Sequence, residues 1–115
     1  MTEYEEDLRK IAKGLDDKVL FTGFVPHHQI LEVYRLADIG VVPSIYDDPA
    51  PLVVIECMAA GLPLIVTDSG GIPEYVADEC AIIIKREDDI VNGLKESLIT
   101  LTENQELRET MSRNA

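Results

Sequence analysis

Two acidic residues in the middle of the chain are the strongest candidates for chemistry. Asp48 lies just before an apolar segment and Glu56 lies within it, with seven residues between the two. Pro51 suits the first turn of a helix, and Gly61 followed by Pro63 suits its end. Glu56 would then lie about 7.5 Å along the axis of that helix. The sequence therefore predicts two carboxylates near the N-terminal end of one helix.

A carboxylate in an almost wholly apolar helix needs polar partners. The rest of the predicted helix is apolar or small, so we expect it to be buried, and an ionised Glu56 there is costly without hydrogen bonds. Ribose hydroxyls are suitable donors, because a carboxylate accepts two hydrogen bonds from a vicinal diol. The free backbone amides and the dipole at the N-terminus of the helix favour the binding of anions. Asp48, just before this end, could accept hydrogen bonds from sugar hydroxyls. Alternatively, Glu56 could lie at the helix surface and pair with a lysine or cap a neighbouring loop. Asp48 could be an ordinary acidic residue that interacts favourably with the helix dipole.

Four short apolar runs predict the strands that position this helix. They are rich in β-branched residues, and their continuous hydrophobicity is typical of parallel strands covered on both faces. Amphipathic segments between them predict helices. The strands are expected at 19–22, 39–42, 64–67 and 81–84, and the helices at 3–14, 27–37, 51–60, 88–101 and 105–113, with a further short helix between the last two strands. This alternation predicts one α/β, Rossmann-like domain, a parallel sheet of about four strands with helices on both faces.

The loops that follow the predicted strands collect the residues suited to binding. In open parallel sheets, ligands bind beyond the carboxyl ends of the strands. Turn, glycine and acidic residues gather there, over 23–26, 43–48 and 68–74. We therefore expect the functional site at this edge of the sheet.

Charge and composition exclude several kinds of partner. The 115 residues include 10 basic and 22 acidic side chains, a formal charge of −12, which repels nucleic acid and anionic membrane surfaces. No apolar run approaches the roughly 20 residues of a membrane span, and no signal peptide is evident. Cys57 and Cys80 lie in apolar stretches and are expected to be reduced core thiols. We expect a cytoplasmic protein.

Taken in order, these features resemble one family. Residues 43–63, with Asp48 and Glu56, and the loop 67–74 resemble the C-terminal domain of the retaining GT-B glycosyltransferases of family 4. That family carries two acidic residues separated by seven others, then a helix of small residues and a Gly-Gly-x-x-Glu loop. Residues 19–25 also resemble its strand and loop beside the nucleotide base. The resemblance covers nearly the whole chain.

The resemblance implies a role for particular residues. Glu56 would hold the 2′- and 3′-hydroxyls of the donor's ribose, and Asp48 would be the catalytic residue facing the donor sugar. Gly70 and Gly71 would let their loop approach the donor closely, and both would also serve turns that need positive φ. The other substrate-binding positions are Phe24 and Val25 beside the base, and Ala50, Pro51, Leu52 and Val53 beside the sugar and phosphates.

Two positions depart from the family's pattern. Asp48 stands where the family usually has Glu, and Asp47 could take its place in a shifted register. Pro51 stands where the family commonly has Gly, and proline offers no N–H to the donor. His27 and His28 are expected to be exposed at a helix start, because the family's catalytic-side histidine lies in the other domain.

The resemblance also implies a longer parent protein. Residues 1–115 would be a single, partial nucleotide-sugar-binding domain without the first β-α segment and the N-terminal acceptor domain, and inactive alone. The parent, a hexosyltransferase that would be cytoplasmic or peripheral at the inner membrane face, would transfer sugar from a nucleoside diphosphate sugar to a sugar or glycolipid acceptor during polysaccharide synthesis. No cofactor or metal is predicted.

Three other functions fit parts of the pattern. A nucleotide-sugar epimerase or a phosphorylase of GT-B architecture would also bind nucleotide or phosphate at these strand ends, although the acidic pair favours the transferase. A receiver-like signalling domain would use Asp47 and Asp48 as its acidic cluster, but it leaves the Gly-Gly loop unexplained. A structural module would respond to no ligand.

Overall fold

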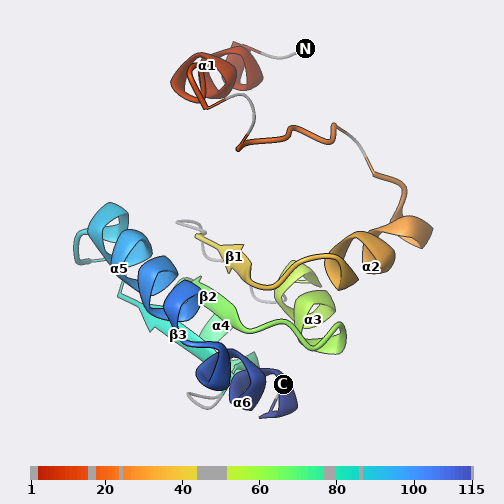
Figure 1. The fold of residues 1–115 in the computed structure, drawn as a ribbon, viewed down its shortest axis with the longest axis vertical. Helices are drawn as coiled ribbons and strands as arrows, with labels where there is room; N and C mark the ends of the chain where they lie inside the picture. The colour runs from red at the N-terminus through yellow and green to blue at the C-terminus, as the bar shows by residue number, and fades with distance from the viewer. Residues whose placement is uncertain are drawn as a thin grey trace.

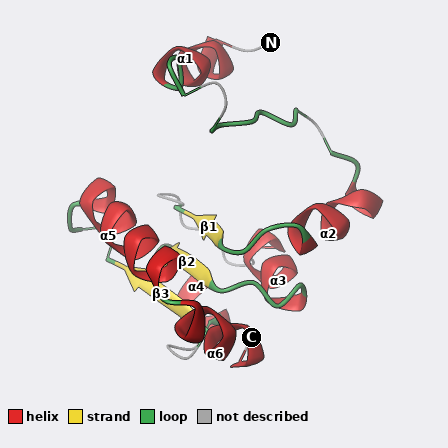
Figure 2. Cartoon of the chain, in the orientation of Figure 1, coloured by secondary structure: helices red, strands yellow, loops and turns green. Residues whose placement is uncertain are grey.

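Helices and strands form where the periodicity of the sequence places them, with one exception among the strands. The computed structural model describes residues 3–15, 18–23, 25–43, 52–76, 80–85 and 87–114 (Figures 1 and 2). In chain order the elements are α1 (Glu3–Ile11), α2 (His27–Arg35), β1 (Gly40–Val42), α3 (Leu52–Ala59), β2 (Leu64–Thr67), α4 (Ile72–Tyr75), β3 (Ala81–Ile84), α5 (Ile90–Glu103) and α6 (Gln105–Asn114).

The three strands form one parallel sheet in the order β1-β2-β3. Leu64 at the start of β2 is the register partner of Gly40 on one side and of Ala81 on the other. All four residues of β2 are buried. A central strand covered on both faces needs apolar side chains in both directions, which accounts for its unbroken hydrophobic run.

Helices cover both faces of this sheet (Figure 1). On one face Leu64 and Val66 belong to a core with Val54 of α3. On the other face Ile65 belongs to a second core with Leu101 of α5. The predicted fold class is confirmed: an α/β fold with a parallel sheet between helices.

The run at residues 19–22, predicted to be a strand, is not part of the sheet. It follows α1, and both lie away from the strands in Figure 1. Leu20 is 87% exposed, and the guanidinium of Arg9 stacks 4.7 Å from the centre of the Phe21 ring. A strand needs a hydrogen-bonded neighbour, and among the described residues β1 pairs with β2 alone. Without a neighbour, apolar composition does not make this segment a strand.

The helix that carries Glu56 has a well-defined end. Gly61 adopts a φ of +75°, and its N–H donates to the carbonyl of Met58 at 3.0 Å. The N–H of Leu62 donates to the carbonyl of Cys57 at 3.1 Å. These two bonds are those of a Schellman motif, which turns the chain from α3 towards β2. The predicted end of the helix at Gly61 is confirmed.

The expectation that α3 is buried on all sides is wrong. Within α3 only Val54 and Cys57 are buried. Leu52, Val53 and Ile55 are 64%, 48% and 37% exposed. The helix covers one face of a sheet, so only the side chains that point to the sheet are enclosed. Glu56 therefore lies at the border between the core and the surface.

Candidate functional site

The predicted site residues divide into those that the structure describes and those that it does not. Asp48, the predicted catalytic residue, lies outside the described residues, as do Asp47, Phe24, Ala50 and Pro51. Their predicted roles remain predictions. The described positions are Val25, Leu52, Val53, Glu56, Gly70 and Gly71.

Glu56 is the described carboxylate with the most informative surroundings. Its side chain is 25% exposed. Its Oε2 accepts a hydrogen bond of 3.4 Å from the hydroxyl of Tyr34, and its Oε1 lies 3.8 Å from Nδ1 of His27. The second contact is an ion pair only when the imidazole is protonated. The two carboxylate oxygens thus face two different side chains of α2.

His27 and Tyr34 reach the same carboxylate because of their spacing on α2. They lie seven residues apart, about 10.5 Å along the helix axis, which places them on one face two turns apart. That face packs against α3. His27 is highly exposed, as predicted, whereas Tyr34 is half-buried and packs against the core that contains Val54. In the sequence, Tyr34 is marked by no local signal other than its spacing of seven residues from His27.

Burial at this contact also changes the acidity of the neighbouring groups. Burial, the nearby Cys57 and Glu56, and the hydrogen bond to Glu56 raise the pKa of Tyr34 above its ordinary value. Burial and then the negative charge of Glu56 raise the pKa of the Cys57 thiol. Both groups therefore favour their protonated forms. Cys57 and Cys80 are both buried thiols, as the sequence predicts.

The glycine loop after β2 is built differently from the prediction at one of its two positions. Gly70 is exposed and adopts a φ of +52°, as expected. Gly71 does not need positive φ: its φ is −83°, and it is the N-cap residue of α4. Upstream, the buried hydroxyls of Thr67 and Ser69 are 3.2 Å apart and hydrogen-bonded. The loop thus begins at the buried, polar end of β2 and continues into α4, which packs against α3.

The described site residues lie around α3. Val25 is half-buried and precedes Pro26, the N-cap residue of α2, so it lies two positions before His27. Leu52 and Val53 are exposed in the first turn of α3, one turn before Glu56. The arrangement offers a fixed carboxylate beside exposed apolar side chains. Such a surface can accept hydrogen bonds from hydroxyl groups and contact a planar or alicyclic ring.

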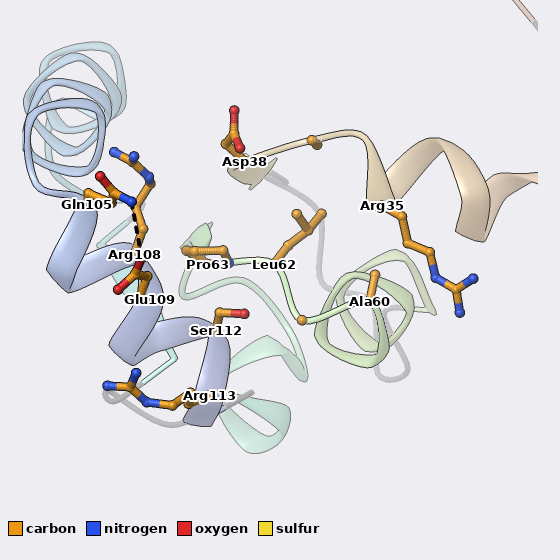
Figure 3. A pocket seen from close by; sticks show the side chains of 12 residues that line it. Arg35, Asp38, Ala60, Leu62, Pro63, Gln105, Arg108, Glu109, Ser112 and Arg113 are labelled. Atoms are coloured by element: carbon orange, nitrogen blue, oxygen red, sulfur yellow. Dashed lines mark hydrogen bonds between the residues drawn. The ribbon is translucent and has the colours of Figure 1, made fainter.

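A cavity of about 560 Å³ lies elsewhere, between the end of α2, the turn from α3 to β2, and α6. Arg108 donates to the carbonyls of Leu101 and Thr102, so its guanidinium is engaged at the end of α5. Figure 3 shows Arg35 and Arg113 pointing away from each other. The amide of Gln105 donates to Glu109 at 3.1 Å. Arg108 and Gln105 therefore make their hydrogen bonds to α5 and within α6, and not to a group across the cavity.

The described part of the chain contains neither a cluster of metal ligands nor a helix that could span a membrane. Within it, no three His, Cys, Asp or Glu side chains come together as metal ligands. None of its helices combines the length and the apolar character that a bilayer crossing requires.

Comparison with known proteins places these features in a family. The sequence profile described as "Glycosyl transferases group 1" matches residues 2–115. The putative glycosyltransferase YtcC of Bacillus subtilis is 32% identical over 113 residues, which are 98% of this chain and 28% of that protein. The alpha-D-kanosaminyltransferase of Streptomyces kanamyceticus is 32% identical over 114 residues, which are 95% and 28% of the two proteins.

Solved structures agree with the sequence comparison. The sucrose-phosphate synthase of Thermosynechococcus elongatus superposes with a TM-score of 0.83 at 28% identity, over 95% of this chain and 27% of that one. The C-terminal domain of the glycosyl transferase group 1 family protein LpcC of Francisella tularensis superposes with a TM-score of 0.82 at 27% identity, over 97% and 58% of the two chains. The chain spans just over a quarter of the two curated relatives above, at 28% of each. The fold is that of a GT-B glycosyltransferase C-terminal domain, and the chain belongs to the glycosyl transferases group 1 family.

Proposed function

We propose that this chain is the part of a retaining GT-B glycosyltransferase of family 4 that binds the nucleoside diphosphate sugar donor. The observation that carries the proposal is the carboxylate of Glu56, which is held between α2 and α3 with a quarter of its side chain open to solvent. Membership of the group 1 family supports a sugar-transfer reaction. Glu56 is assigned to the 2′- and 3′-hydroxyls of the donor's ribose.

The chemistry of the carboxylate supports this assignment. An ionised carboxylate has about four acceptor positions on its two oxygens. Among the described residues, Tyr34 occupies one of them and His27 can take a second, which leaves two for the two hydroxyls of a ribose. Hydrogen bonds from neutral donors to a charged acceptor are stronger than those between neutral groups. Glu56 can therefore recognise a diol with its present partners in place.

The remaining roles follow the same assignment. Val25 and Phe24 are assigned to the base, Ala50, Pro51, Leu52 and Val53 to the sugar and phosphates, and Gly70 and Gly71 to the loop beside the donor. Asp48 is assigned to the hydroxyls of the transferred sugar, as the catalytic residue. Because the donor is anionic and the chain carries a formal charge of −12, we expect donor binding to be weak.

The parent protein would transfer a hexose, with retention of configuration, to a sugar or glycolipid acceptor bound by another domain. Glycan or polysaccharide synthesis in the cytoplasm, at the inner membrane face in the case of a lipid acceptor, is the expected setting. Residues 1–115 alone are expected to bind donor without turnover and to need no cofactor or metal.

An amide NMR titration of the chain with UDP, GDP and ADP, each to about 10 mM, tests the proposal, since that concentration detects dissociation constants in the millimolar range. We expect one nucleotide to shift amides near Val25, Leu52–Ala59 and Gly70, and Glu56→Gln to remove these shifts. A matched control is Glu32→Gln, at an exposed position of α2, which should leave them unchanged. Absence of any localised shift with all three nucleotides would overturn the proposal.

A further inference from the structure

We propose that Tyr34 is a positioning residue for donor binding: its hydroxyl holds the carboxylate of Glu56 in the orientation that a ribose diol requires. The inference rests on the proposed function and extends it to a residue that does not itself touch the donor. It is carried by the hydrogen bond of 3.4 Å from the Tyr34 hydroxyl to Oε2 of Glu56, which joins residues 22 positions apart in the sequence.

Glu56 needs such a partner because of where it lies. A glutamate side chain has several rotatable bonds, and ordering it costs free energy. The residues three and four positions from Glu56 are its side-chain neighbours on a helix, and they are all apolar: Leu52, Val53, Ala59 and Ala60. The helix itself therefore offers this carboxylate no hydrogen-bonding side chain. A carboxylate that must accept two hydrogen bonds at fixed positions binds more tightly when its orientation is set beforehand.

Tyr34 is suited to this role because its ring is anchored. It packs against the core cluster of α3, β2 and α4, which contains Val54, Leu64 and Ile72. A ring held by packing has few orientations, so its hydroxyl presents a hydrogen-bond donor at a nearly fixed point. The raised pKa of Tyr34, caused first by burial, keeps this hydroxyl protonated and able to donate.

The contact leaves the other side of the carboxylate for the ligand. Tyr34 donates to Oε2, whereas the contact of Oε1 among the described residues is with His27, whose side chain is 86% exposed. An exposed imidazole at 3.8 Å restrains its partner weakly, because solvent screens the pair and both side chains keep their mobility. Tyr34 and not His27 is therefore the residue that sets the orientation of Glu56.

The experiment compares two ligands that differ only at the ribose. Calorimetry or NMR titration measures the dissociation constants of UDP, GDP and ADP and of their 2′,3′-dideoxy counterparts for the 115-residue chain. The variants are Tyr34→Phe, which removes the hydroxyl and keeps the ring, and Tyr4→Phe, a matched change at a residue that is 71% exposed on α1. The thermal midpoint of each variant shows whether the fold is retained.

We expect the unmodified chain to bind the ribonucleotide about tenfold or more tighter than the dideoxynucleotide, because two hydrogen bonds to a charged acceptor are lost. Tyr34→Phe should raise the dissociation constant of the ribonucleotide about 3- to 10-fold. It should raise that of the dideoxynucleotide less than about twofold. In a Glu56→Gln background, Tyr34→Phe should have no further effect on the ratio of the two affinities.

The possible results separate the two claims. A wild-type preference for ribose that persists undiminished in Tyr34→Phe would refute the positioning role and leave the proposed function standing. A wild-type chain that binds both ligands equally would refute the assignment of Glu56 to the ribose, and with it the role of Tyr34. Equal weakening of both ligands by Tyr34→Phe would indicate a merely structural residue and would also refute the positioning role.

Discussion

Gly40 on β1 and Leu64 on β2 are register partners, and a Cβ atom at Gly40 would lie 2.9 Å from Cδ2 of Leu64. The same Cβ would lie 3.4 Å from Sγ of Cys57, so β1, β2 and α3 meet at this glycine. Leu64 is fully buried and cannot turn aside freely. The absence of a side chain at position 40 is therefore what allows α3 and β2 to pack closely against β1.

Gly40→Ala should accordingly lower the free energy of unfolding by about 1–3 kcal/mol, the usual cost of overpacking a core. Urea denaturation followed by circular dichroism measures the change. Val41→Ala, at the adjacent and 40% exposed position of the same strand, is the control and should cost less. An unchanged denaturation midpoint in Gly40→Ala would contradict the close packing described for this position.

The end of α3 gives a second prediction. Gly61 has a φ of +75°, and a Cβ there would lie 3.3 Å from Oγ of Ser112 on α6. Gly61→Ala should destabilise the chain by about 1 kcal/mol, because alanine is strained in the left-handed region. Gly61→Asn should cost less, since asparagine tolerates that conformation. Chemical denaturation of the two variants tests this, and the reverse order of stability would contradict the Schellman motif.

The thiol of Cys57 gives a prediction on pH. Its pKa is raised in the folded chain by burial and then by Glu56, so the unfolded chain loses this proton at a lower pH than the folded chain. The resulting contribution to stability is complete below the ordinary thiol pKa of about 8.5 and is lost as the pH rises through the folded pKa.

Stability should therefore fall as the pH rises above about 8.5, and Cys57→Ala should reduce that slope. Denaturation midpoints of the two proteins across this range provide the measurement. The pKa of Tyr34 is also raised, so the unmodified chain and Cys57→Ala should both lose further stability at higher pH. Parallel pH profiles for the two proteins would show that the thiol has the same pKa in both states.

His27 and Glu56 should contribute little to stability as a pair. His27 is 86% exposed and 3.8 Å from the carboxylate, and exposed pairs contribute at most about 1 kcal/mol. His27→Ala should thus shift the thermal midpoint by no more than about 4 °C. A much larger loss would mean that His27 has a structural role beyond this contact.

The sequence predicts the parts of this fold that depend on local pattern. The runs that became β1, β2 and β3 are apolar in both directions because both faces of the sheet are covered. Gly61 ends α3 because few other residues adopt its φ. Residues 19–22 have an equally apolar pattern, but a strand also depends on a neighbouring strand, and that information is not local.

The surroundings of Glu56 show a similar limit. Glu56 stands out in sequence as a carboxylate in an apolar helix, whereas Tyr34 and His27 become relevant only when α2 packs against α3. Likewise, hydrophobicity alone does not indicate that Leu52 faces outward from α3. The conformation of Gly71 depends on its position as the N-cap of α4, which a pair of adjacent glycines does not specify.

The most direct test of the central claim, that Glu56 binds the ribose of a nucleotide donor, is calorimetric titration of the chain and of Glu56→Gln with the nucleotide that shifts its amides. The substitution keeps the size of the side chain and removes its charge. We predict that it weakens binding about 10-fold or more, while the exposed control Glu32→Gln stays within about twofold of the unmodified chain. Equal affinities for the unmodified chain and Glu56→Gln would contradict the claim.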